Sequence, residues 1–190
     1  SADHGTSPPR VRIPRQYNAA WDLIQRNLQA GRRAKTAYID DHGSYTFGDL
    51  AERVNRFGNV LGGMGLEAED RVLLCLLDTI DFPTAFLGSI QAGIVPIAAN
   101  TLLTTADYDF MLGDSRAKAL IVSEALWPAF APIVAKHKTL RHVIGPQALR
   151  IALPPTVGFL VQVIKGTALA SVIGFIELTK AGTMITNATF

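Results

Sequence analysis

Short apolar runs alternate with longer stretches of mixed hydrophobic and polar residues over most of this chain. The run VLLCLL at 72–77 is continuously apolar, as is typical of a strand buried on both faces of a parallel sheet. A helix is predicted to follow it, with Asp81 as its cap, Pro83 in its first turn and Gly93 as a left-handed C-cap. A second strand at 94–98 completes a unit of two parallel strands with a right-handed crossover.

The same periodicity predicts elements on both sides of this unit. Helices are predicted at residues 18–28, at 46–61 with a capping box of Thr46 and Asp49 and a Glu52–Arg56 pair, from Thr104 or Thr105 to 112, and at 124–135 with Ser123 as cap. Strands are predicted at 117–122 and 140–144, and a hairpin joins 36–39 to 44–45 through a four-residue turn. The predicted fold class is α/β, a partial layer of parallel sheet with flanking helices, followed by a hydrophobic helical segment at the C-terminal end.

Length and composition allow one globular domain with an appendage, because the chain has 190 residues and is 48% hydrophobic. Residues 1–16 contain Gly5, Pro8, Pro9 and Pro14, so they are expected to hold no regular structure and to form a mobile arm. The net charge is only +2, and the Arg and Lys residues of the first 35 positions are spread thinly, which favours a solvated lead-in over contact with nucleic acid or an anionic membrane. The single Cys75 and the lack of an apolar leader predict a cytoplasmic location.

Several polar clusters suggest chemistry, but each fits an ordinary structural role better. Residues 40–42 (Asp-Asp-His) lie on a predicted turn, where neighbours rarely converge on one metal ion. The glycines of 62–65 follow a helix, whose C-terminus repels phosphate, and the strand-to-helix turn 78–81 carries two carboxylates and no glycine. His137 and His142 have no acid or Cys spaced to complete a triad, so both are expected at the surface. The sequence therefore assigns no catalytic, cofactor-binding or metal-binding residue.

The composition changes at Gly145. Residues 156–178 are long enough to span a bilayer but include Gln162 and Lys165, which need partners inside a membrane. Two interpretations remain open for this segment: a membrane-derived span, or a buried pair of amphipathic helices that covers an exposed apolar face of the sheet. The domain prediction is an arm at 1–16, an incomplete α/β domain at 17–144 and a hydrophobic segment at 145–190.

Residues 17–144 resemble the beginning of an AMP-forming acyl- or aryl-CoA synthetase, most closely the benzoate–CoA ligases. The resemblance is carried by SYTFGDL at 44–50, GL at 65–66, EDRV at 69–72, AFLG at 85–88, QAGIVP at 91–96 and Asn100. It implies a parent enzyme that joins a small aromatic carboxylic acid to ATP with release of pyrophosphate and passes the acyl group to coenzyme A, with magnesium.

That chemistry requires a Gly-rich loop ending in Pro-Lys-Gly, a Thr-Glu motif, an Asp for the ribose and a late Lys, because charge develops on the transferring phosphate. None of these motifs occurs in this chain, and neither Lys165 nor Lys180 has the surrounding sequence. The resemblance therefore implies no cofactor for this chain alone, and no catalytic residue is transferred to it.

Residues 146–190 resemble a different family, the permease subunit of polar amino-acid ABC transporters. This resemblance rests on PQALRIALPP at 146–155, FLVQVIKGT at 159–167, ASVIGFIEL at 170–178 and AG at 181–182. It implies membrane association through 156–178 and, as an alternative location, the inner membrane. The remaining transmembrane helices of such a permease are missing, so transport by this chain alone is not expected.

The preferred prediction is a chimeric or truncated chain, a ligase fragment joined near 141–145 to a permease fragment. It predicts an aryl-CoA ligase parent and no catalysis by the isolated chain. The alternatives are a membrane-inserted permease fragment and a non-catalytic structural or interaction module. The sequence does not specify an oligomeric state.

Overall fold

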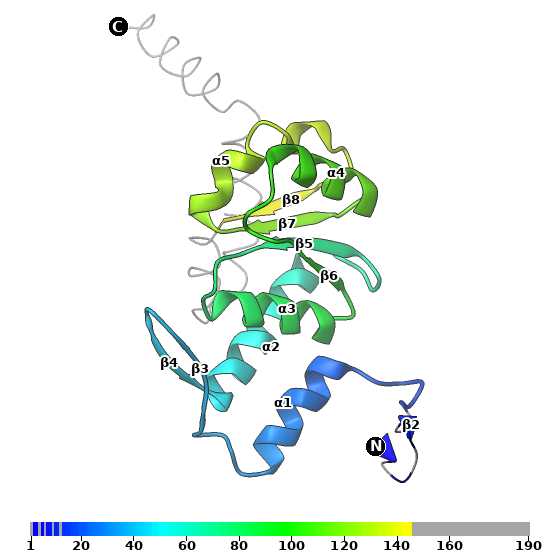
Figure 1. The fold of residues 1–190 in the computed structure, drawn as a ribbon, viewed down its shortest axis with the longest axis vertical. Coiled ribbons are helices and arrows are strands. Elements are labelled where there is room, and N and C mark those ends of the chain that lie inside the picture. Colours follow the sequence, from blue (N-terminus) through cyan, green and yellow to red (C-terminus); the bar gives the residue numbers. More distant parts are fainter. Residues whose placement is uncertain (1, 4, 6, 9, 12, 146–190) are drawn as a thin grey trace, which may run out of the picture.

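A four-stranded, fully parallel sheet lies at the centre of the protein (Figure 1). The computed structural model describes residues 2–3, 5, 7–8, 10–11 and 13–145. The strand order is β6-β5-β7-β8, and the strands are β5 Arg71–Cys75, β6 Val95–Ala98, β7 Ala119–Val122 and β8 His142–Ile144. The predicted α/β fold with a parallel sheet and flanking helices is confirmed, with strand ends that differ from the predicted ends by one or two residues.

Helices cover both faces of this sheet. One face carries α2 (Phe47–Gly63) and α3 (Asp81–Gln91), and the other carries α4 (Thr105–Ser115) and α5 (Trp127–Phe130). The side chains of successive residues of β5 point to opposite faces of the sheet, as they do in any strand. Val72 and Leu74 pack toward α2 and α3, whereas Leu73 and Cys75 pack toward α4 and α5. Burial on both sides explains why this run contains no polar residue.

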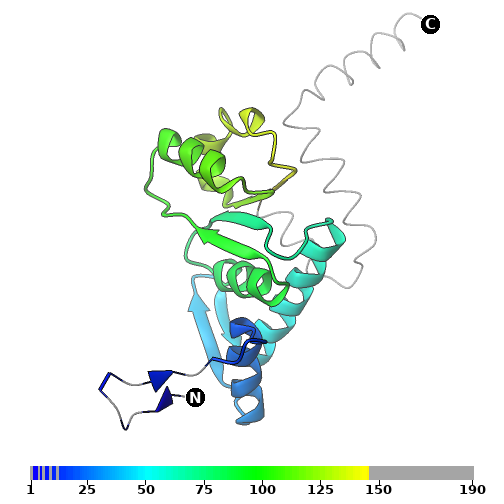
Figure 2. The same ribbon diagram turned by 90° about the vertical axis from the view of Figure 1, so that its right-hand side faces the viewer.

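A further layer lies against the other side of α2. It consists of α1 (Ala19–Gln29) and the antiparallel hairpin of β3 (Thr36–Asp40) and β4 (Gly43–Thr46). Ile24, Val54 and Ile80 are buried between these elements. Asn18 caps α1, because its Oδ1 accepts a hydrogen bond from Trp21 N. Its Nδ2 donates to Ile90 O at 2.7 Å, which connects the start of α1 to the end of α3. Figures 1 and 2 show the layers following one another along the long axis of the molecule.

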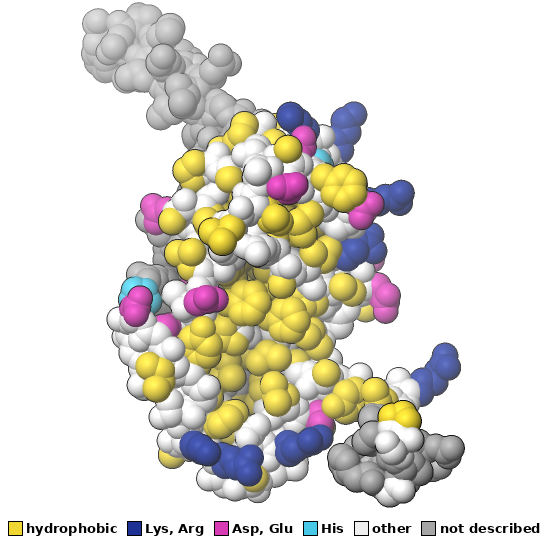
Figure 3. Space-filling model, viewed as in Figure 1, with side chains coloured by type: hydrophobic (Ala, Val, Ile, Leu, Met, Phe, Trp, Pro, Cys, Tyr) yellow, Lys and Arg dark blue, Asp and Glu magenta, His cyan; other side chains and the backbone are white. Residues whose placement is uncertain are grey.

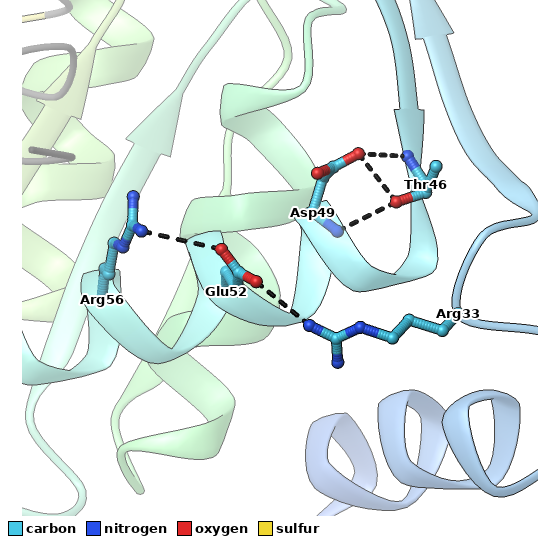
Figure 4. Close-up of polar contacts among 5 residues, drawn as sticks. All are labelled: Arg33, Thr46, Asp49, Glu52 and Arg56. Atoms are coloured by element: carbon cyan, nitrogen blue, oxygen red, sulfur yellow. Dashed lines mark hydrogen bonds and ion pairs between the residues drawn. The ribbon is translucent and has the colours of Figure 1, made fainter.

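The predicted capping box at the start of α2 is confirmed (Figure 4). Asp49 N donates to Thr46 Oγ1 at 3.1 Å, and Thr46 N donates to Asp49 Oδ2 at 2.8 Å. The Thr46 hydroxyl also donates to Asp49 Oδ2, at 2.7 Å. The bond from the Thr46 backbone N–H first, and the bond from its hydroxyl second, lower the pKa of Asp49 below its usual value. The predicted Glu52–Arg56 pair is also present at 3.6 Å, and Glu52 holds Arg33 at 3.1 Å with its other oxygen.

Glycine allows the turn that ends α3. Gly93 has φ +78, and its N–H donates to Ile90 O at 3.0 Å, as expected for a residue just past a helix end. The chain then enters β6 directly. The predicted role of Gly93 as a left-handed C-cap is therefore confirmed.

Two other predicted caps are wrong. Asp81 is the first residue of α3, and its carboxylate binds Arg53 instead of capping the helix. Ser123 caps nothing, because the predicted helix 124–135 is divided into η1 (Glu124–Leu126), α5 and η2 (Val134–Lys136). Pro132 explains the break, since it lacks the N–H that would continue α5.

The hairpin turn is shorter than predicted. Asp40 pairs with Gly43, so only Asp41 and His42 lie in the turn. At the N-terminal end, where no regular structure is predicted, two-residue strands β1 (Ala2–Asp3) and β2 (Arg10–Val11) form an antiparallel pair. Such a short pair is below the length at which a hairpin is stable by itself, so the prediction of a mobile arm remains a prediction.

Candidate functional site

The carboxyl ends of the parallel strands are the place where a site is expected. In open α/β sheets, ligands bind beyond these ends at the point where the strand order reverses. Here that point lies between β5 and β7, because the chain passes from β5 to β6 on one side and then crosses to β7 on the other. The loops after β5, β6 and β7 therefore form the candidate site.

Ser123, which follows β7, is hydrogen-bonded to the end of β5 and to the loop after it. Its N–H donates to Cys75 O at 3.0 Å, and its hydroxyl oxygen accepts from Leu77 N at 2.9 Å. The side chain is buried, at 9% exposure. The hydroxyl group thus joins two loops of the protein, which explains why it does not cap the following helix.

The turn after β5 is held by the hairpin. Ile80 N donates to Asp40 Oδ2 at 2.8 Å, while His42 N and Gly43 N donate to Asp40 Oδ1 at 2.8 and 3.1 Å. Desolvation raises the pKa of Asp40, but these three N–H donors outweigh it and bring the pKa below its usual value. The Asp-Asp-His cluster forms the turn of the hairpin, as predicted. Among residues 13–145, no three His, Cys, Asp or Glu side chains are placed so that they could hold one metal ion.

The positive charge closest to the start of α3 is already neutralised. Arg53 Nη2 lies 2.7 Å from Asp81 Oδ1, and Arg53 Nε donates to Thr84 Oγ1 at 3.2 Å. The guanidinium group also lies 5.6 Å from the centre of the Tyr45 ring. Both charged side chains are mostly buried, at 20% and 16% exposure. Arg53 is therefore committed to holding α2 against α3 and does not present its charge to a phosphate.

Tyr108 organises the loop after β6. Its hydroxyl group donates to Asn100 O at 2.8 Å and accepts a weak bond from Cys75 Sγ at 3.5 Å. Burial, followed by the contact with Cys75, raises the pKa of Tyr108 to about 12. Burial also raises the pKa of the Cys75 thiol, which makes it a poor nucleophile. Asn100 Oδ1 in turn accepts from Leu102 N at 2.9 Å and shapes the turn into α4.

The prediction that His137 lies at the surface is wrong. His137 Nε2 lies 2.7 Å from Asp109 Oδ1 on α4, and the His137 side chain is only 12% exposed. The bond to His137, and next the charge of Lys136, lower the pKa of Asp109. Sequence reasoning missed this pair because Asp109 lies 28 residues earlier and meets His137 only through the packing of η2 on α4. His142 is partly buried in β8.

Within the described residues, the loop groups at this edge are mainly bonded to one another. Ser123, Asp40, Asp81 and Arg53 all have partners within the protein. Asp78 and Leu77 are exposed, but a carboxylate and an aliphatic side chain do not bind phosphate. In residues 13–145 these groups connect the hairpin, α2, α3 and the loops at the carboxyl ends of the strands.

Comparison with known proteins defines the family. A sequence profile of the AMP-binding enzymes matches residues 24–158. This chain belongs to the AMP-binding enzyme family. It is 58% identical over 144 residues to a benzoate–CoA ligase of Thauera aromatica, and 42% identical over 131 residues to a 4-hydroxybenzoate–CoA/benzoate–CoA ligase of Rhodopseudomonas palustris. These matches include 75% and 69% of this chain but only 27% and 24% of the relatives.

Solved structures agree with this assignment. A benzoate CoA ligase from Burkholderia xenovorans LB400 is 42% identical with a TM-score of 0.64, and the match covers 78% of this chain and 29% of that one. An anthranilate CoA ligase in complex with anthranoyl-AMP is 30% identical with a TM-score of 0.68, over 79% of this chain and 28% of that one. The chain thus spans about a quarter of the length of the relatives it matches.

The resemblance to a transporter permease finds no support in these comparisons, since the relatives reported above are ligases. The family match also continues to residue 158, past the expected junction near 141–145. In the part of the chain that the structure describes, no helix has the length and apolar character needed to cross a bilayer. The predicted membrane segment 156–178 lies outside the described residues.

Proposed function

We propose that this chain is the N-terminal part of an AMP-forming ligase that couples a small aromatic acid, of which benzoate is the best candidate, to coenzyme A. The carrying observation is the 58% identity to the Thauera aromatica benzoate–CoA ligase over 144 residues. In the proposed reaction, a carboxylate oxygen attacks the α-phosphate of ATP and pyrophosphate leaves. The coenzyme A thiol then attacks the acyl carbon, and AMP leaves as the thioester forms.

The proposal gives this chain a scaffolding role in that reaction. The described residues do not fit a magnesium–ATP site, because the Arg53 charge and the Ser123 hydroxyl are bonded internally and the turn at 78–81 carries carboxylates. Phosphoryl chemistry needs preorganised N–H donors and cations, which the family's loop and lysine motifs supply and this sequence lacks. We therefore propose that the chain alone forms no acyl-adenylate. We also propose that it works in the cytoplasm.

A chimeric enzyme tests the proposed role. The corresponding quarter of the Thauera aromatica ligase is replaced by residues 17–144 of this chain, and benzoate-dependent ATP–pyrophosphate exchange is measured beside the unmodified ligase. We expect the chimera to retain benzoate-dependent exchange and thioester formation. A chimera that folds with the same thermal transition as the parent ligase but forms no benzoyl-adenylate contradicts the proposed function.

The isolated chain provides the second measurement. We expect no pyrophosphate exchange above background with benzoate, since the phosphate-binding motifs are absent from the sequence. Detectable benzoate-dependent exchange by the chain alone contradicts the scaffolding role, while leaving the substrate class of the parent enzyme intact.

A further inference from the structure

Two side chains from distant parts of the chain hold the loop at 77–80, which lies between β5 and α3. At the start of the loop, Ser123 Oγ accepts from Leu77 N at 2.9 Å. At its end, Asp40 Oδ2 accepts from Ile80 N at 2.8 Å. The partners in these two bonds are 46 and 40 residues apart in the sequence. Both ends of the loop are therefore fixed by other elements of the fold.

Among the described residues, the N–H groups at the two ends of this loop have no other acceptor. The local bonds run from Thr79 N to Leu77 O at 2.7 Å and from Phe82 N to Thr79 O at 3.0 Å. Ile80 stands at the cap position of α3 but its side chain makes no hydrogen bond, so the carboxylate of Asp40 reaches this end of the helix from the hairpin. Loss of either acceptor would leave an N–H group unsatisfied and free one end of the loop.

The loop borders the point between β5 and β7 where a ligand is expected. Leu77 is 42% exposed and Asp78 is also exposed, whereas Ile80 is buried among side chains of α1 and α2. Figure 3 shows acidic and histidine side chains gathered at the surface at the tip of the hairpin, beside the start of α3. A ligand at the carboxyl end of the sheet would therefore meet the exposed half of a loop whose other half is anchored.

We propose that Asp40 and Ser123 are positioning residues of the ligase reaction, an inference that rests on the proposed function. Neither side chain touches a substrate in this proposal. Both act through the loop at 77–80, which they hold in place beside the substrate site. Because a displacement of about 1 Å in a site can cost about 10²-fold in rate, two hydrogen bonds to one loop are enough to affect the reaction.

The chimeric ligase that carries residues 17–144 provides the kinetic test. Asp40→Ala and Ser123→Ala are introduced separately, and the KM values for benzoate, ATP and coenzyme A are measured in thioester formation. Each substitution should raise at least one of these KM values by about fivefold or more, because the loop beside the site is no longer held. KM is the informative quantity, since a loss of folded enzyme lowers the measured kcat but leaves KM unchanged.

Asp49→Ala and Ser89→Ala are the matched controls. Asp49 also accepts backbone N–H bonds, but only within the capping box of α2. Ser89 is also a buried serine, and its hydroxyl donates to Ala85 O at 2.7 Å inside α3. These substitutions remove bonds that do not reach the loop, so each KM should stay within about twofold of its value in the unsubstituted chimera.

Conservative variants cover the case in which an alanine variant does not fold. Ser123→Thr keeps the hydroxyl group, and Asp40→Asn keeps an acceptor oxygen. Both should bring the KM values to within about threefold of those of the unsubstituted chimera, because the N–H groups at 77 and 80 again have an acceptor.

Amide exchange in the full 190-residue chain measures the loop without requiring activity. Asp40→Ala should speed exchange of Ile80 N–H by about tenfold or more, and Asp49→Ala should not, because only Asp40 bonds this group.

Unchanged exchange at Ile80, KM values that stay within about twofold in both alanine variants, or equal KM changes in the controls each overturn the positioning role. An unsubstituted chimera without activity overturns the proposed function and this inference with it. An active chimera whose KM values do not respond overturns only the positioning role.

Discussion

Tyr108 shows how one residue connects three parts of the fold. Its hydroxyl group links Cys75 on β5 to Asn100 in the loop after β6, and its ring stacks on Phe130 of α5 with 4.3 Å between ring centres. Only 1% of the residue is exposed. Because the hydroxyl group is buried and hydrogen-bonded, the neutral phenol is strongly preferred over the phenolate.

This preference predicts a late step in an alkaline titration. A phenol in water has a pKa near 10, whereas the pKa of Tyr108 is about 12 in the folded protein. Stability from the neutral phenol is fully present below pH ~10 and is lost as the pH rises toward ~12, because the unfolded state then ionises first. Absorbance at about 295 nm should show one tyrosine titrating last.

Tyr108→Phe is the matching variant. It should remove that last step and lower the free energy of unfolding by about 0.5–1.5 kcal/mol, the usual cost of one hydrogen bond. A Tyr108→Phe protein that still shows the late tyrosine step contradicts the assignment.

At the scale of the elements, the contact between α2 and α3 depends on Gly88. A Cβ atom at this position would lie 2.7 Å from Phe57 Cδ1 and 3.1 Å from both Phe57 Cβ and Val54 O. Those atoms belong to the buried centre of α2, so they cannot move away easily. The two helices approach closely because this position has no side chain.

A pair of Gly→Ala substitutions tests that close approach. Gly88→Ala should lower the free energy of unfolding by about 1–3 kcal/mol through overpacking, measured by urea denaturation. Gly62→Ala, in α2 with nothing within 4 Å of the added atom, should be neutral or stabilising by up to about 1 kcal/mol. Equal effects of the two substitutions contradict the packing explanation.

The start of α4 resolves an alternative that the sequence leaves open. Thr104, not Thr105, is the cap: its hydroxyl accepts from Asp107 N at 3.3 Å, and its own N–H donates to Asp107 Oδ2 at 2.9 Å. The Thr104 hydroxyl and then its N–H lower the pKa of Asp107. Thr105 is the first residue inside the helix.

Substitution of each threonine separates the two roles. Thr104→Ala should lower the free energy of unfolding by about 1 kcal/mol, because a satisfied N-cap is lost. Thr105→Ala should have no cost or a small gain, since Ala has the higher helix propensity. Thermal unfolding of both variants measures the difference, and a larger loss in Thr105→Ala is the contradictory result.

For the whole molecule, the centre of the sheet is expected to be the most stable region. β5 and β7 are bonded on both edges and covered on both faces, and Leu73, Leu74, Leu120 and Ile121 are fully buried. The hairpin β3–β4 is a separate two-stranded sheet whose strands pair with no other strand of the described residues, and Ile39 on it is 70% exposed. Local opening should therefore be easiest in the hairpin and hardest in β5 and β7.

Native-state hydrogen exchange measures this order directly. We expect the amides of β5 and β7 to exchange only through global unfolding and those of β3 and β4 to exchange through smaller openings at lower free energy. Exchange from the hairpin amides that is as slow as from β5 would show that the outer layer unfolds together with the sheet.

Local patterns allowed much of this fold to be predicted. The buried strands, the capping box of Thr46 and Asp49 and the left-handed turn at Gly93 depend on residues a few positions apart, whose spacing the sequence displays. The proline break within 124–135 could also have been read from Pro132. No catalytic residue was predicted. In residues 13–145, several of the contacts around the candidate site join residues that are far apart in the sequence.

The amino-acid sequence by itself determined most of the strand-and-helix elements, with ends displaced by a few residues, and the resemblance to the ligase family. Only the tertiary structure decided the order of the strands, the partner of Arg53 and that of His137. Arg53 and Asp81 are 28 residues apart, as are Asp109 and His137. Periodicity reports which face of an element is buried, but not which other element covers that face. Contacts between distant positions therefore follow from packing and not from spacing along the chain.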